Sequence, residues 1–308
     1  MKHSKRDFLR IGDLTLTELR QVLTLARTLK DELKGRRTET LKGRSVAVVM
    51  EKPSTRTRVS FEVGVAQLGG HPVVLTTAGS QIARGEPVKD TARVLSGYCD
   101  MIVYRTFASE TLQEMATHAS VPVINALSDD GHPVQVLCDV FTIEEALGRS
   151  VEGMRVAWVG DGSSNMARSF VEAAQIFGFH LTMAAPPDYL PPTHEREAAV
   201  KAGSLSIHGT IEGAVAGCQA VNTDVWTSMG QEAEQQKRLQ AFAGYTLNEK
   251  HFAGAAPGAI VLHCLPAHRG EEIDNELIEG SRSRVWSQAE NRLHVQKALM
   301  MFLMGLAS

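Results

Sequence analysis

The sequence predicts an α/β protein of two doubly wound parallel-sheet domains, with the active site in the cleft between them. Short β-branched runs alternate with helical patterns along the chain, which is typical of parallel sheets with crossover helices. The chain has 308 residues, of which 43% are hydrophobic, and this length favours two cores over one. Polar residues directly follow the predicted strands in both halves, where open α/β sheets bind their ligands.

The first domain is predicted to span residues 1–147. Thr15 and Glu18 form a capping-box pair that begins its first helix, and the helix after the first strand is expected to end at the glycines 69 and 70. Strands are expected at residues 45–50, 72–76, 101–104 and 121–126, with helices around residues 88–98 and 111–118.

The second domain is predicted to span residues 148–287, after a connecting helix that begins at Pro133. Residues 224–250 are rich in Gln and Glu, and the segment is longer than an ordinary connection between elements. It is therefore a candidate mobile binding loop. The last helix is expected at about 289–306, and residues 288–308 are expected to pack back on the first domain. The predicted strands are residues 155–160, 181–184, 205–207, 220–223 and 259–263.

Composition argues against several classes of partner. The formal net charge is -3 and the sequence pI is about 6.4, so no global basic field favours nucleic acid or anionic lipid. No apolar run is long enough to span a membrane, and the first ten residues lack the apolar core of a signal peptide, so a cytoplasmic location is expected. The four cysteines are scattered, which argues against a disulfide framework or a structural zinc site.

Residues 52–58, with the sequence Lys-Pro-Ser-Thr-Arg-Thr-Arg, lie between a predicted strand and a predicted helix. Their hydroxyls and guanidiniums, together with the free backbone N–H groups of a helix N-terminus, suit a phosphate with several oxygens. The same residues also suit a capped helix with a solvated basic first turn. This segment alone leaves both interpretations open.

Other candidate anion ligands follow later elements. Arg105 ends an apolar strand and would bind a phosphate through two bonds if it reaches the same sheet edge as Arg56. His132 lies at or just before a helix start, where the helix dipole favours neutral imidazole, which can donate to an oxyanion. The alternatives are a solvated Arg105, a capping His132, an exposed Gln135 in the first helical turn and a surface charge at Arg292.

The second half offers a different set of groups. Gly160 and Gly162 follow a strand as in a dinucleotide site, but Asn165 occupies the third glycine position, and an Asn at a helix N-terminus suits a carboxylate. Asp224 suits an ammonium group, although Asp is also an ordinary turn residue. Cys264 ends a strand, where it is either a buried small hydrophobe or a thiol that orients an amine.

Residues 54–58 together with His-Pro-Val-Gln at 132–135 resemble the signature of the aspartate and ornithine carbamoyltransferase family, and the resemblance spans the whole chain. Ser-Met-Gly at 228–230 and His-Cys-Leu-Pro at 263–266 resemble the ornithine-using branch. An aspartate-using relative would be expected to carry an arginine in the second motif, because a dicarboxylic acceptor needs an extra cation. Ser164 and Ser287 depart from the usual family pattern.

The resemblance implies a first domain that binds carbamoyl phosphate, a second that binds L-ornithine, no cofactor and no metal. It also implies a homotrimer, or a multiple of trimers, built on the first domain. The implied carbamoyl phosphate ligands are Ser54, Thr55, Arg56, Thr57, Arg105, His132, Gln135, Cys264, Leu265 and Arg292, with Gln81 from a neighbouring subunit. The implied ornithine ligands are Asn165, Asp224, Ser228 and Met229. Arg105, His132, Asp224 and Cys264 are the implied catalytic residues.

The implied reaction is attack of the neutral δ-amine of ornithine on the carbamoyl carbon, which gives citrulline and phosphate in arginine biosynthesis. Three alternatives stay open at this point. A relative could carbamoylate another amine, such as putrescine or an N-acylated ornithine. A nicotinamide-dependent dehydrogenase would need the dinucleotide motif that Asn165 interrupts. A noncatalytic amino-acid-binding protein would not need both His132 and Cys264 at strand ends.

Overall fold

The computed structural model describes residues 5–31, 37–76, 85–228 and 232–307. The chain divides into two compact units, Met1–Leu137 with Glu290–Ser308, and Cys138–Ala289. Two helices contain the divisions between the units: α5 (Pro133–Leu147) and α12 (Val285–Leu303). Among the described residues, no helix combines the length and apolar character needed to cross a membrane.

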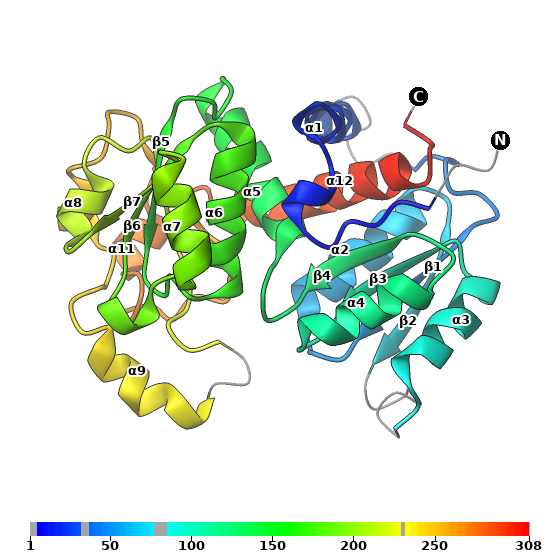
Figure 1. Cartoon of the computed structure of the whole chain (residues 1–308). Helices are drawn as coiled ribbons and strands as arrows, with labels where there is room; N and C mark the ends of the chain where they lie inside the picture. The colour runs from blue at the N-terminus through cyan, green and yellow to red at the C-terminus, as the bar shows by residue number, and fades with distance from the viewer. Residues whose placement is uncertain (1–4, 32–36, 77–84, 229–231, 308) are drawn as a thin grey trace. The chain divides into compact units, whose positions relative to one another are not determined.

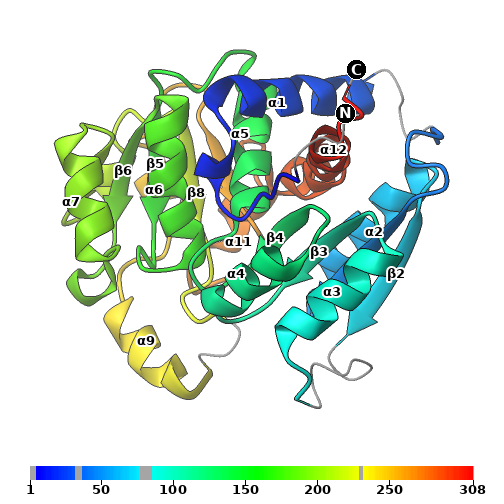
Figure 2. The same cartoon turned by 45° about the vertical axis from the view of Figure 1, so that its right-hand side comes forward.

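The first unit contains a four-stranded parallel sheet in the order β2-β1-β3-β4 (Figure 1). Helices α3 and α4 cover one face and α2 packs on the other, where α12 lies against α2 (Figure 2). The strands are β1 (Ser45–Met50), β2 (His71–Thr76), β3 (Met101–Arg105) and β4 (Val123–Leu127). The helices are α1 (Leu16–Asp31), α2 (Thr55–Gln67), α3 (Val88–Tyr98) and α4 (Ser109–His118), after a 3₁₀ turn η1 (Ile11–Asp13).

The register of the first sheet places the ends of its central strands side by side. Met50, the last residue of β1, pairs with Arg105, the last residue of β3. The apolar side chains of these strands are buried, and Ala47, Ile102 and Tyr104 pack with the inner faces of α3 and α4. The residues that immediately follow β1 and β3 therefore leave the sheet at one edge.

The second unit contains a five-stranded parallel sheet in the order β7-β6-β5-β8-β9. The all-parallel α/β class predicted for both halves is confirmed. The strands are β5 (Arg155–Val159), β6 (His180–Ala184), β7 (Leu205–His208), β8 (Ala220–Thr223) and β9 (Ile260–His263). The helical segments are α6 (Asn165–Phe177), η4 (Pro187–Tyr189), α7 (Thr193–Lys201), α8 (Ile211–Val215), η5 (Glu232–Glu234), α9 (Gln235–Ala241), α10 (Glu249–Phe252) and α11 (Asn275–Glu279).

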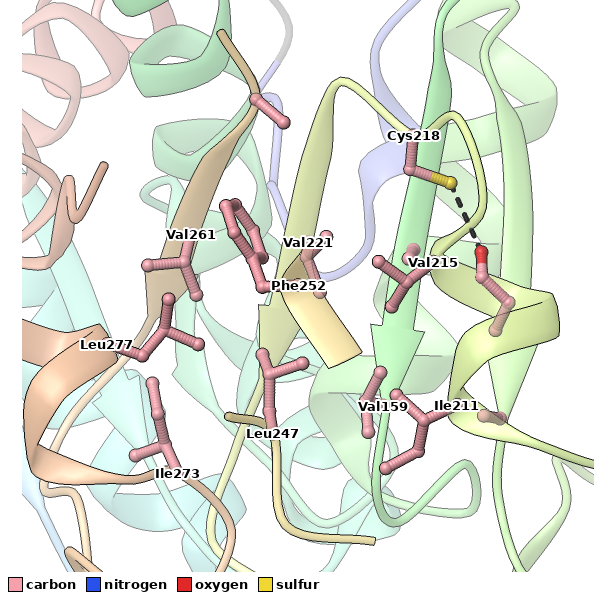
Figure 3. Packing of buried hydrophobic residues seen from close by; sticks show 14 of the residues in the cluster. Val159, Ile211, Val215, Cys218, Val221, Leu247, Phe252, Val261, Ile273 and Leu277 are labelled. Carbon is pink, nitrogen blue, oxygen red and sulfur yellow. Dashed lines mark hydrogen bonds between the residues drawn. The ribbon is translucent and has the colours of Figure 1, made fainter. Parts of the chain in front are cut away.

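A cluster of branched apolar side chains fills the space between this sheet and helices α8, α10 and α11 (Figure 3). Val159, Val221 and Val261 contribute to it from three adjacent strands. The thiol of Cys218 donates to the carbonyl oxygen of Ala214 at 3.2 Å, and burial raises the pKa of this thiol. Cys218 is therefore a packing residue and not a reactive one.

Two predicted elements differ from the structure. The last helix begins at Val285 and not at residue 289, because Val285 is buried in the core of the second unit and the N–H of Gln288 bonds to the carbonyl of Arg284 at 2.7 Å. Arg292 consequently lies in the second turn of α12 and does not open it. Residues 224–250 are also not one irregular loop, since η5, α9 and the start of α10 fall within this segment, and its role in binding stays a prediction.

Candidate active site

In the first unit, the predicted phosphate-binding segment begins α2. Ser54 is the N-cap residue, and its hydroxyl oxygen accepts from the backbone N–H of Thr57 at 3.3 Å. Thr57 is buried, Arg56 is half-buried and Thr55 is exposed at the first helical position. Arg58 is exposed, and its guanidinium pairs with Glu62 one turn further on. The capped-helix interpretation is thus correct for Arg58, whereas Thr57 belongs to a buried polar group.

Arg292 joins three helices of the first unit. It is buried, and its two terminal nitrogens donate to the amide oxygen of Gln135 and, at 2.8 Å, to the hydroxyl of Thr57. Gln135 is also buried, in the first turn of α5. The alternatives of a surface charge at Arg292 and an exposed Gln135 were wrong. Both of these partners are neutral oxygens, and a buried guanidinium that presents paired N–H groups beside them suits a site for an anion.

Arg105 and Lys52 add two buried cations at the same edge of the sheet. The Arg105 Nε donates to the carbonyl oxygen of Lys52 at 3.2 Å, so Arg105 does not extend into solvent. The Lys52 ammonium lies 3.3 Å from Asp129 and 5.0 Å from the ring centroid of Phe107. Lys52 is the first residue of the predicted phosphate-binding segment, but no role was predicted for it. Its position just after a buried strand was the signal that could have identified it as a buried cation.

His132 lies immediately before α5, as predicted, and is buried. Burial lowers its pKa well below the usual value, and the charges of Arg292, Arg105 and Lys52 lower it further. The predicted direction is confirmed, and its causes in the structure are desolvation and the charges of three cations, whereas the expected effect of the helix dipole stays a prediction. Near neutral pH the ring is therefore neutral, and a neutral ring can donate one hydrogen bond to an oxyanion.

In the second unit, Asp224 and Cys264 follow two neighbouring strands. Thr223 of β8 pairs with His263 of β9, which places the next residue of each strand side by side. The Cys264 thiol donates to Oδ1 of Asp224 at 3.1 Å, and the backbone N–H of Val225 donates to the same oxygen at 2.8 Å. Burial raises the pKa of Asp224, against the opposing effects of His263 and of these two hydrogen bonds. Cys264 is only partly buried, unlike the other three cysteines.

The backbone after Cys264 is held by one ring nitrogen of His263, and the other ring nitrogen bonds to a buried carboxylate. Nδ1 accepts from the backbone N–H of Leu265 at 2.9 Å, so the ring proton lies on Nε2, which donates to Glu272 at 3.0 Å. Leu265 has a φ of 62° and precedes a cis peptide bond to Pro266.

The remaining predicted ornithine ligands lie near these strand ends or outside the described residues. Asn165 is the first residue of α6, and Ser164 caps that helix by accepting from the N–H of Ala167 at 3.2 Å. Ser228 is half-buried in the segment after β8. Met229, and Gln81 of the carbamoyl phosphate set, lie outside the residues that the structure describes.

The dinucleotide interpretation of Gly160 and Gly162 is not supported by the local packing. A Cβ at Gly162 would lie 2.7 Å from the sulfur of Met183 and 2.9 Å from the carbonyl oxygen of Tyr189. The glycine is therefore required by close approach of the protein's own side chains and backbone. The carboxylate of Asp161, between the two glycines, is bonded to Arg238 at 2.7 Å.

Among the described residues of the second unit, two groups of side chains have ligand atoms close enough to hold a metal ion. These are Asp224 with His263 and Cys264, and His268 with Glu271 and Glu272. In the first group both ring nitrogens of His263 already hydrogen-bond to protein atoms. In the second, Oε1 of Glu272 accepts from His263 and from the backbone N–H of His268. Independence from metal stays a prediction for this chain.

The fold and the two residue groups define an α/β enzyme that binds an oxyanion in one unit and presents a carboxylate and a thiol in the other. The family model described as "Aspartate/ornithine carbamoyltransferase, carbamoyl-P binding domain" matches residues 6–145, and the model described as "Aspartate/ornithine carbamoyltransferase, Asp/Orn binding domain" matches residues 152–303. The chain belongs to the aspartate/ornithine carbamoyltransferase family.

Individual relatives lie on the ornithine side of this family. The chain is 64% identical over 309 residues to a protein of Sorangium cellulosum named ornithine carbamoyltransferase, covering 98% of this chain and 99% of the relative. It is similar to the crystal structure of ornithine carbamoyltransferase from Thermus thermophilus, with a TM-score of 0.89 and 40% identity, covering 97% of this chain and 99% of that one. The ornithine carbamoyltransferase structure from Pyrococcus furiosus has a TM-score of 0.91 and 41% identity, with 98% of each chain covered.

Proposed function

We propose that one group of residues in each unit binds one of the two substrates of this protein. The protein transfers the carbamoyl group of carbamoyl phosphate to the δ-amine of L-ornithine and yields L-citrulline and phosphate. The observation that carries the assignment is the buried guanidinium of Arg292, bonded to Thr57 and Gln135 beside His132 and Arg105. These residues are among those that the family resemblance assigns to carbamoyl phosphate.

The first unit supplies the charges that carbamoyl phosphate requires. Arg56, Arg105 and Arg292 neutralise the leaving phosphate, and the hydroxyls of Ser54, Thr55 and Thr57 lie at a helix N-terminus that favours an anion. Thr57, Arg105 and His132 donate to the carbonyl oxygen as negative charge develops on it. Each such donor is typically worth about 3 to 4 kcal/mol of transition-state stabilisation.

The second unit supplies the acceptor side. Asp224 and Cys264 hold the δ-amine, and Asn165, Ser228 and Met229 hold the amino-acid end of ornithine. The neutral amine attacks the carbamoyl carbon, a C–N bond forms, and the C–O bond breaks with its electron pair passing to phosphate. The amine proton leaves with the phosphate, so the step balances without a metal or cofactor. Cys264 and Leu265 also contact carbamoyl phosphate in this scheme.

A colorimetric citrulline assay with carbamoyl phosphate and L-ornithine tests the activity. Putrescine and an N-acylated ornithine are the control acceptors, and neither is favoured, since the relatives compared above are named for ornithine. Citrulline formation at micromolar enzyme is the expected result. Activity with putrescine and none with ornithine would contradict the assignment of Asn165, Ser228 and Met229 to the amino-acid end of the acceptor.

We also propose that the protein forms a homotrimer, or a multiple of trimers, through the first unit, with Gln81 reaching a neighbouring subunit. Exposed apolar side chains on its outer helices support an interface, namely Val59 and Val63 on α2 and Val94 and Tyr98 on α3. Light scattering should give three times the 33.5 kDa chain mass, or a multiple of that value. A monomer at assay concentration would contradict this proposal.

A role in arginine biosynthesis and a cytoplasmic location complete the proposal. One similar structure, from Campylobacter jejuni, is titled anabolic, with 38% identity and a TM-score of 0.90. The four cysteines carry free thiols, as expected in a reducing compartment. A strain that lacks its own ornithine carbamoyltransferase and expresses this protein should grow on medium without arginine, which tests the biosynthetic role. Cell fractionation tests the cytoplasmic location.

A further inference from the structure

Arg238 is a buried cation outside the residues assigned to the reaction. It lies on the short helix α9 in a polar stretch of sequence, yet only 4% of it is exposed. Burying a guanidinium is costly unless its charge and N–H groups are satisfied. Its position therefore calls for a specific set of partners.

One partner is local, since Nε of Arg238 donates to the carboxylate of Glu234 at 3.3 Å, and three others come from separate segments of the second unit. Nη1 of Arg238 donates to Oδ2 of Asp161 at 2.7 Å and to the carbonyl oxygen of Trp226 at 2.8 Å. The guanidinium carbon also lies 4.9 Å from the ring centroid of Tyr189, which follows β6. One side chain thus connects the residues after β5, after β6 and after β8.

Asp161 extends this connection to the start of α6. The residue is 3% exposed, and its second oxygen, Oδ1, accepts from the backbone N–H of Ser163 at 2.8 Å and from the Ser163 hydroxyl at 2.6 Å. The Asp161 carbonyl oxygen accepts from the hydroxyl of Ser164, the N-cap of α6, at 2.9 Å. The turn that places Asn165 is therefore attached to Arg238 through one carboxylate.

Trp226 extends the connection to the residues after β8. Its indole ring stacks on Phe242 at 5.6 Å with an interplanar angle of 16°, and Phe242 in turn lies 4.7 Å from Tyr189. The carbonyl oxygen of Trp226 is thus bonded to Arg238 of α9, and its ring packs on Phe242, which directly follows α9. Trp226 is two residues from Asp224 and two from Ser228 along the chain.

We infer that Arg238 and Asp161 are positioning residues that set the separation between the Asn165 turn and the Asp224 to Ser228 segment, and thereby the affinity for ornithine. The inference rests on the ornithine contacts proposed above for these segments. Neither residue needs to touch the substrate. Because the shared guanidinium is the donor to both loops, its loss lets the two sides of the ornithine site move independently.

Steady-state kinetics of Arg238→Met, Arg238→Lys and Asp161→Asn test this role. Arg238→Met should raise KM for ornithine at least tenfold and leave KM for carbamoyl phosphate within twofold of the wild type. Arg238→Lys retains the charge and should give a smaller rise. The double variant Asp161→Asn/Arg238→Met should resemble the more impaired single variant, because both changes break the same pair.

Arg168→Met is the matched control, since Arg168 of α6 pairs with Glu195 of α7 at 2.6 Å in the same unit. Arg168→Met should lose about as much thermal stability as Arg238→Met, and its KM for ornithine should stay unchanged. The inference fails if Arg168→Met raises this KM as much as Arg238→Met, or if the Arg238 and Asp161 variants raise both KM values equally or neither. If Arg238→Met does not fold, Arg238→Lys and Asp161→Asn test the inference in the same way, through the change in KM for ornithine relative to the change in KM for carbamoyl phosphate. Lack of citrulline formation by the wild type would instead refute the activity itself.

Discussion

Protonation of His132 is expected to destabilise the protein as the pH falls below about 6.5, the ordinary histidine value. Burial and the neighbouring cations lower the pKa of His132 well below that value in the folded state. Between the two pKa values, the unfolded chain binds a proton that the folded chain does not. Stability therefore rises with pH in this window and is lost as the pH falls.

The magnitude follows from the linkage relation. A single group that is protonated only in the unfolded state changes the free energy of unfolding by about 1.4 kcal/mol per pH unit. His132→Gln removes the titrating group and keeps a donor of similar reach. The stability of the wild type relative to the variant should therefore fall as the pH is lowered from 7 to 5, by at most about 1.4 kcal/mol for each pH unit below about 6.5.

Urea unfolding followed by circular dichroism at several pH values measures this difference. Asp224 has a pKa that burial raises, so its contribution has the opposite sign, but it is common to both proteins and cancels in the comparison. Parallel stability curves for wild type and His132→Gln between pH 7 and 5 would show that His132 is not held neutral by the fold.

Three further outcomes are expected. Cys264→Ala, which removes the thiol bonded to Asp224, should lower kcat/KM for ornithine about three- to tenfold and change KM for carbamoyl phosphate less, as steady-state kinetics would show. The wild-type kcat/KM for ornithine should rise from pH 6 to 9 as more of the amine becomes neutral, and a flat profile would contradict attack by the neutral amine. Gly162→Ala should cost about 1 to 3 kcal/mol in thermal unfolding because its Cβ would meet a sulfur at 2.7 Å, whereas Gly97→Ala, with open space around it, should not destabilise.

Much of the fold could be predicted from local pattern. The strands Ser45–Met50 and Ala220–Thr223 have the predicted bounds, because runs of β-branched residues between turn residues define a strand locally. The start of α12 could not be predicted, since Val285 is helical through burial in a core formed by distant strands. Helix α9 was missed because its residues are polar, and what holds Arg238 there is a carboxylate 77 positions away.

Sequence motifs were sufficient to name the candidate site residues and the family, because the residue types needed to bind phosphate and amine are few. The sequence did not show which of the residues contact one another. Arg292 bonds Thr57 across 235 positions and Gln135 across 157, and no local pattern specifies such pairs.

The sequence by itself determined the two parallel sheets and the types of chemical groups at their strand ends. The tertiary structure decided the state of those groups. His132 is neutral and Asp224 has a raised pKa mainly because packing removes both from water, and desolvation depends on every element that covers a side chain. Arg58 and Arg56 are two residues apart in one motif, yet Arg56 is half-buried whereas Arg58 is exposed and pairs with Glu62, because side chains two residues apart on a helix point to different sides of it.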